Sequence, residues 1–84
     1  MKNCMITFRS VTPAQRAEGL LRRAGMESTL QRTPRWMEEQ GCGYSLRVHC
    51  REVMQALEVL RSRDVSFRKV YLTRENGKME ELAL

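Results

Sequence analysis

The chain has 84 residues, of which 42% are hydrophobic and 30% are charged. This length and composition predict one small globular domain, residues 1–84, and argue against a disordered or multidomain chain. The formal net charge of +5 is compatible with nucleic acid, membrane or acidic protein partners. The basic residues are scattered along the chain, however, and we interpret them as a solvated basic surface.

No apolar run is long enough to cross a membrane, and the N-terminal residues lack the apolar core of a signal peptide. We therefore expect a cytoplasmic protein, in which thiols stay reduced. The three cysteines Cys4, Cys42 and Cys50 contain no C-x-x-C pair, which argues against a disulfide framework and an ordinary zinc site. Neither a P-loop nor a dinucleotide fingerprint is present, so we expect no cofactor and no metal.

The first element is a strand over residues 2–9, where side chains alternate between two faces. A helix follows, with Thr12 as the expected N-cap, Pro13 in the first helical position and Gln15 completing a capping box. Apolar residues recur on one face at helical spacing, and Gly25 is expected to end the helix.

The second half of the chain repeats this pattern after a short strand. Residues 28–33 are polar and strand-like, which predicts an edge strand that stops at Pro34. The pattern then predicts a strand, a helix, a strand and a short returning strand, over residues 44–50, 51–63, 66–73 and 79–84. A single helical turn is the alternative for the last of these.

This order of elements is typical of an α+β, ferredoxin-like βαββαβ sandwich, an antiparallel sheet with two helices on one face. Right-handed crossovers place the first and third strands side by side in the middle of the sheet. We expect Ile6 opposite Val48 in that pair. The same register puts Cys4 opposite Cys50 on the helix-facing side, as reduced thiols whose Cα atoms lie within about 7 Å.

The other face of the sheet is expected to be open. Its two central strands present no Phe, Tyr or Trp, which makes RNA binding by base stacking a poor fit; they carry Met5, Thr7, Arg9, Ser45, Arg47 and His49. In the fourth strand, simple alternation groups Phe67 with Tyr71 on one side of the sheet. Some apolar surface would then face outward, so we expect a cover, either residues 79–84 or a second subunit in a homodimer.

The strongest candidate for chemistry is Cys42, between Gly41 and Gly43. The two glycines leave the sulfur uncrowded, and their backbone can adopt the dihedral angles that a tight loop requires. The alternative is that Cys42 is a small residue in a glycine turn, without a function. Cys4 and Cys50 lie on apolar sides of their strands, where cysteine acts as a small hydrophobic residue.

Three other residues are expected to support Cys42. The topology brings it near the start of the first helix, where N–H groups around Thr12 favour an anion. Arg35 or Arg9 could add a positive charge. Each effect lowers the pKa of a thiol and raises the fraction of reactive thiolate.

Several runs of the sequence resemble the selenium/sulfur carrier protein-like family of small bacterial and archaeal domains. These runs are I-T-F-R-S, A-x-x-A-E-G-L-L-R-R-A-G-M, T-P-R, and C-G before a strand. The resemblance covers about Met5 to Leu72, and its sharpest parts are Pro34-Arg35 and Cys42-Gly43. It implies a cytosolic carrier, at most sulfurtransferase-like, that holds sulfur or selenium on Cys42 and passes it from a protein donor to a protein acceptor. The alternative is a non-catalytic interaction or dimerisation module.

Overall fold

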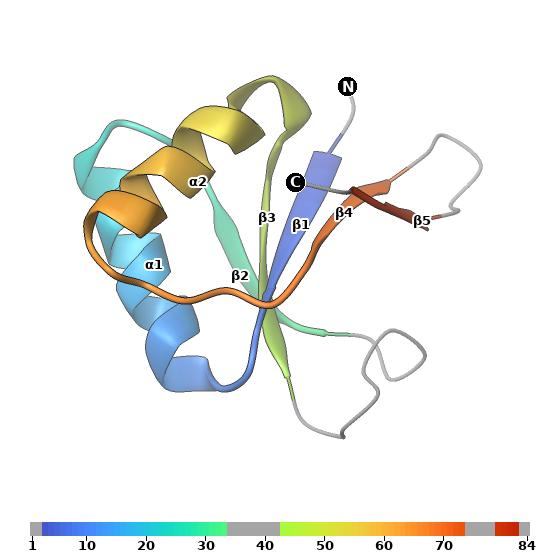
Figure 1. The fold of residues 1–84 in the computed structure, drawn as a ribbon, viewed down its shortest axis with the longest axis horizontal. Helices are drawn as coiled ribbons and strands as arrows, with labels where there is room; N and C mark the ends of the chain where they lie inside the picture. The colour runs from blue at the N-terminus through green and yellow to red at the C-terminus, as the bar shows by residue number, and fades with distance from the viewer. Residues whose placement is uncertain (1–2, 34–42, 74–78, 83–84) are drawn as a thin grey trace.

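The computed structural model describes residues 3–33, 43–73 and 79–82. Its elements are β1 (Asn3–Phe8), α1 (Val11–Arg23), β2 (Thr29–Arg32), β3 (Tyr44–His49), a short 3-10 helix η2 (Cys50–Glu52), α2 (Val53–Ser62), β4 (Val70–Thr73) and β5 (Met79–Glu81). The strands form one antiparallel sheet in the order β2-β3-β1-β4-β5. Both helices lie on one side of it (Figure 1). The α+β class, the central antiparallel pair of β1 with β3 and the returning strand β5 are thereby confirmed, and the helical turn is wrong.

The hydrophobic core fills the space between the two helices and the sheet. Alanines on both helices are fully buried, which permits close approach of each helix to the layer it covers. The sheet contributes larger side chains, with Phe8 the largest that is fully buried. The principal members of the core are Ile6, Phe8, Ala14, Ala17, Leu21, Leu46, Val48, Ala56, Leu57, Leu60 and Val70.

Helix α1 begins before the position that its capping pattern predicts. The N-cap is Ser10, in an extended conformation, and Thr12 lies exposed in the first turn. The prediction of Thr12 as N-cap is therefore wrong. Pro13 fits the third helical position as well as the first, because none of the first-turn N–H groups has a partner within the helix. At the other end, Gly25 has a φ of 81°, as expected for a glycine that ends a helix.

The register of β1 against β3 differs from the prediction by two residues. Ile6 pairs with Leu46, and Cys4 pairs with Val48. A shift of two residues leaves every side chain on the same face of a strand, so the hydrophobic pattern cannot detect it. The expected pairing of Ile6 with Val48 is wrong, although both residues face the helices as expected.

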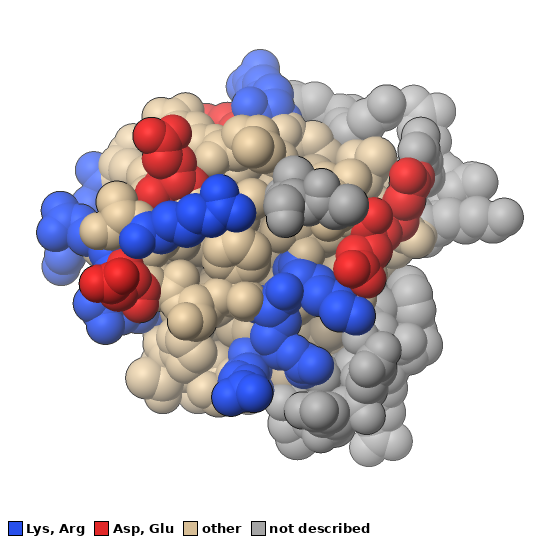
Figure 2. Space-filling model, in the orientation of Figure 1, with Lys and Arg blue, Asp and Glu red and all other residues tan. Residues whose placement is uncertain are grey.

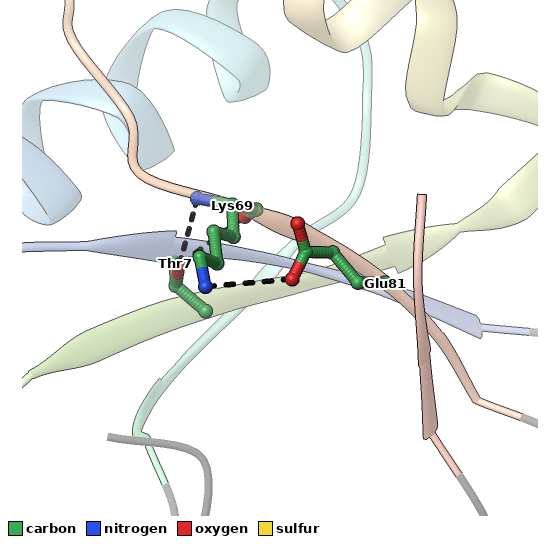
Figure 3. Close-up of polar contacts among 3 residues, drawn as sticks. All are labelled: Thr7, Lys69 and Glu81. Carbon is green, nitrogen blue, oxygen red and sulfur yellow. Dashed lines mark hydrogen bonds and ion pairs between the residues drawn. The ribbon is translucent and has the colours of Figure 1, made fainter. Parts of the chain in front are cut away.

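A β-bulge delays the start of β4. The Arg68 N–H group donates to the Thr7 carbonyl at 2.7 Å, and the Thr7 N–H group donates to the Lys69 carbonyl at 2.8 Å. Two residues thus face one, which is the arrangement of a bulge. The Thr7 hydroxyl completes it by accepting a hydrogen bond from the Lys69 N–H group at 3.0 Å and donating to the Lys69 carbonyl at 3.2 Å (Figure 3).

The bulge reverses the alternation of side chains that precede β4. Phe67 packs against the core, and the Arg61 guanidinium of α2 lies 5.7 Å from the centre of its ring. Tyr71 instead pairs with Met5 on the face away from the helices. The predicted grouping of Phe67 with Tyr71 on one face is therefore wrong. The extra residue of the bulge lies between them, so their side chains point to opposite faces of the sheet.

Strand β5 extends the sheet at the β4 edge. The Leu82 N–H group donates to the Val70 carbonyl at 2.8 Å, and the Leu82 side chain packs against the core. Lys69 and Glu81 form an ion pair at 3.4 Å on the face of the sheet away from the helices (Figure 3). The C-terminal segment thus adds an edge strand to the sheet. Residues 79–82 cover the core beside β4 more than they cover the face away from the helices.

The face away from the helices is less open than expected. Met5 and Thr7 are 4% and 5% exposed, and Ser45 is fully buried. Arg9 and Arg47 are exposed as expected, whereas His49 is only partly so. The expectation that all six residues form an exposed surface is therefore wrong for its central members.

The hydroxyl of Thr7 should stabilise the bulge. In Thr7→Val the side chain keeps its shape, but the Lys69 N–H group loses its acceptor, which should lower the free energy of unfolding by about 2 kcal/mol. Amide hydrogen exchange at Lys69 should accelerate with it. Thr7→Ser, which keeps the hydroxyl, should protect the Lys69 amide as the native residue does. Equal exchange rates in the two variants would contradict this role.

Candidate functional site

The structure tests only part of the predicted site. Gly43, Thr12 and Arg9 lie within the described residues, whereas Cys42, Arg35 and Gly41 lie outside them. The roles assigned to all six residues remain predictions. The structure does describe Gly43, the residue after Cys42, at one end of the sheet.

The ends of the 34–42 segment are held together by a backbone hydrogen bond. The Thr33 N–H group donates to the Gly43 carbonyl at 3.0 Å, which continues the antiparallel pair of β2 with β3 by one step beyond Arg32 and Tyr44. Gly43 is buried. The chain therefore leaves the sheet at Thr33 and returns at Gly43 at adjacent positions.

The start of α1 lies at this same end of the sheet (Figure 1). Tyr44 pairs with Phe8, the last residue of β1, and Arg9 follows it with an exposed side chain. Helix α1 has no acidic residue in its first turn, so no carboxylate of that turn offsets the partial positive charge of its N-terminus. A helix N-terminus and a nearby arginine both favour an anion, and the supporting role expected of Thr12 and Arg9 stays a prediction.

Two buried hydroxyl groups near this end escaped the sequence analysis. The Thr33 Oγ1 and Ser45 Oγ atoms are buried and have no hydrogen-bond partner among the described residues. Thr33 lies opposite Gly43, and Gln31, two residues earlier, pairs with Ser45, so Thr33 and Ser45 share the face away from the helices. A buried hydroxyl without a partner is unusual. The only sequence signal was their spacing on the polar side of two strands.

Cys4 and Cys50 meet at the opposite end of the sheet and form a disulfide, with Cα atoms 5.0 Å apart. Their expected proximity is confirmed, whereas their reduced state in the cytosol stays a prediction. Cys50 is also not opposite Cys4 in a strand pair. It begins η2, directly after β3, and this turn of the chain brings it beside Cys4.

A polar pocket of about 340 Å³ lies at the same end of the sheet as the disulfide, on the face away from the helices. Asn3 pairs with His49, and Thr29 pairs with Arg47, so four neighbouring strand positions contribute to its wall. The His49 Nδ1 atom is buried without a hydrogen-bond partner among the described residues. The full lining is Asn3, Glu27, Ser28, Thr29, Arg47, Val48 and His49.

Within residues 3–33, 43–73 and 79–82, no three His, Cys, Asp or Glu side chains are grouped so that they could hold a metal ion. No helix in the described part of the chain is both long and apolar enough to span a membrane. Figure 2 shows basic and acidic side chains interspersed on one face of the molecule, which fits a solvated surface.

The geometry defines a small α+β domain that anchors the residue after Cys42 beside the positive end of a helix. Comparison with protein families agrees with the resemblance found in the sequence. The chain belongs to the family described as "Putative Se/S carrier protein-like", whose model matches residues 3–72. No curated protein and no solved structure matches the chain.

Proposed function

We propose that this protein carries sulfur or selenium on Cys42, as a persulfide or selenopersulfide, and transfers it between protein partners. The observation that carries the proposal is the family match over residues 3–72, a range that includes the Cys42-Gly43 pair. The activity would be that of a carrier or of a simple sulfurtransferase. It needs an accessible thiolate and a docking surface more than a deep pocket.

The transfer consists of two thiol exchange steps. The Cys42 thiolate attacks the outer sulfur of a donor persulfide, a new S–S bond forms, and the donor cysteine leaves as a thiolate. A nucleophile on the acceptor then attacks the outer sulfur on Cys42, and Cys42 leaves as a thiolate. No net oxidant or reductant is required, because the transferred sulfur keeps its oxidation state in both steps.

The described residues support an anion at this position. The first turn of α1 lacks a carboxylate, and Arg9 is exposed beside it, so a thiolate or persulfide near Thr12 would be stabilised. Arg35 would add a second positive charge. Gly41 and Gly43 would leave the sulfur accessible to partner proteins, and buried Gly43 would fix where the loop rejoins the sheet.

Loading with sulfur is the direct test. After incubation with a cysteine desulfurase and cysteine, the intact mass should increase by one sulfur that a reductant removes, and peptide mapping should place it on Cys42. Cys42→Ser should gain none. The double variant Cys4→Ser/Cys50→Ser is the matched control and should gain sulfur as the native protein does. Loading of Cys42→Ser, or no loading of the native protein, would contradict the proposal.

Two further assignments accompany the proposal. We assign the sheet to the ferredoxin-like type, which the order β2-β3-β1-β4 and the antiparallel pairing support, with β5 as an added strand. We also assign the protein to the cytoplasm, where a donor desulfurase and an acceptor enzyme would be its partners. A homodimer remains a prediction that the molar mass in solution would test.

A further inference from the structure

We propose that Cys4 and Cys50 form a second thiol site, independent of Cys42, that exchanges with other thiols through Cys50. In a cytoplasmic protein a disulfide is usually transient, and it then takes part in catalysis or redox sensing. This argument rests on the cytoplasmic location proposed above, and in that compartment the Cys4–Cys50 disulfide points to a dithiol–disulfide couple that accepts and returns two electrons. Its reaction partners would be low-molecular-weight thiols or the dithiol of a reducing protein.

Cys50 and Gly43, the residue after Cys42, lie at opposite ends of β3. Gly43, which follows Cys42, immediately precedes β3, and Cys50 immediately follows it. A strand of six residues spans roughly 20 Å, which is far beyond the reach of a disulfide. Because Gly43 lies this far from Cys50, we expect that Cys50 does not resolve a persulfide on the neighbouring Cys42 and that the pair reacts with a separate partner.

The surroundings of the two sulfur atoms are unequal. Cys4 lies in β1, inside the core, and is 1% exposed. Cys50 begins η2, at the junction of β3 with α2, and is partly exposed. An incoming thiolate must approach the sulfur that it attacks, so in the folded protein Cys50 is the accessible point of attack. Cys4 is the leaving group.

Small thiols reduce the disulfide in two steps. A thiolate attacks the Cys50 sulfur, a mixed disulfide forms on Cys50, and Cys4 leaves and takes up a proton. A second thiolate attacks the outer sulfur of the mixed disulfide, which releases the oxidised small disulfide and leaves Cys50 reduced. The protein disulfide gains two electrons, and two thiols lose one each. In reverse, Cys4 displaces the small thiol from Cys50, which is favoured because the Cα atoms are held 5.0 Å apart.

Trapping the mixed disulfide tests the asymmetry. The variants Cys4→Ser and Cys50→Ser are made on a Cys42→Ser chain, so that carriage on Cys42 cannot affect the result. Each variant is folded, checked by circular dichroism, and incubated with oxidised glutathione. Cys4→Ser should gain one glutathione on Cys50, whereas the buried Cys4 of Cys50→Ser should react at least about tenfold more slowly.

A second measurement uses the Cys42→Ser chain with Cys4 and Cys50 intact. After partial reduction and a short exposure to iodoacetamide, Cys50 should be labelled before Cys4. Oxidised glutathione should convert the reduced pair to a disulfide without a stable glutathione adduct. Equal labelling of the two cysteines, equal glutathionylation of the two single variants, or failure of the pair to oxidise would each overturn the proposal. None of these outcomes depends on whether Cys42 carries sulfur.

Discussion

Reducing the Cys4–Cys50 disulfide should lower the free energy of unfolding by about 4 kcal/mol. The bond joins residues 46 positions apart in sequence. A cross-link across a loop of that length removes conformational entropy from the unfolded chain, and the chain-entropy model gives the stated magnitude. For a domain of this size the change is a large part of the total stability.

Urea unfolding with and without a thiol reductant measures this effect. The midpoint should fall on reduction in the native protein and equally in Cys42→Ser, which retains the disulfide. The double variant Cys4→Ser/Cys50→Ser should unfold at one midpoint whether the reductant is present or not. Identical midpoints for the oxidised and reduced native protein would show that the bond does not restrain the unfolded chain.

The elements of the fold could be predicted because each leaves a local signal. Alternation defined β1 and β3, and helical spacing with Gly25 defined α1. The right-handed connection through α1 then implied that β1 and β3 are central neighbours. The same reasoning brings the end of β1 and the start of β3 together, and Phe8 does pair with Tyr44 there, because strand direction alone decides which ends meet.

The errors concern features that leave no local signal. A register shift of two residues preserves every face, so Ile6 could not be assigned to Leu46 by pattern. The bulge at Thr7 depends on hydrogen bonds to Arg68 and Lys69, residues more than 60 positions away. Whether two neighbouring cysteines are joined depends on the exchange chemistry of their sulfur atoms, which the pattern of apolar residues does not report.

The candidate site also contains residues that the sequence signals and residues that it does not. Gly41, Cys42 and Gly43 stand out in the sequence because of their residue types alone. The unpartnered hydroxyls of Thr33 and Ser45 do not, since Thr and Ser are common on the polar side of strands. Only the register of β2 against β3 and the burial of both atoms single them out.

The packing of α2 on the sheet should be the second large contribution to stability. Leu57 is fully buried in the core, so Leu57→Ala removes apolar contacts and leaves a space that the surroundings fill only in part. We expect the free energy of unfolding to fall by about 3 kcal/mol. Alanine favours the helical conformation, so α2 itself should not be weakened by the change.

Met54→Ala is the matched control, because it truncates a side chain of similar size in the same helix. Met54 is 58% exposed, so its removal should change the free energy of unfolding by less than about 0.5 kcal/mol. Urea unfolding of both variants under oxidising conditions, with the Cys4–Cys50 disulfide intact, gives the comparison. If Met54→Ala were as damaging as Leu57→Ala, the face of α2 that carries Met54 would be covered in solution, and a second subunit on that face would be the explanation to test.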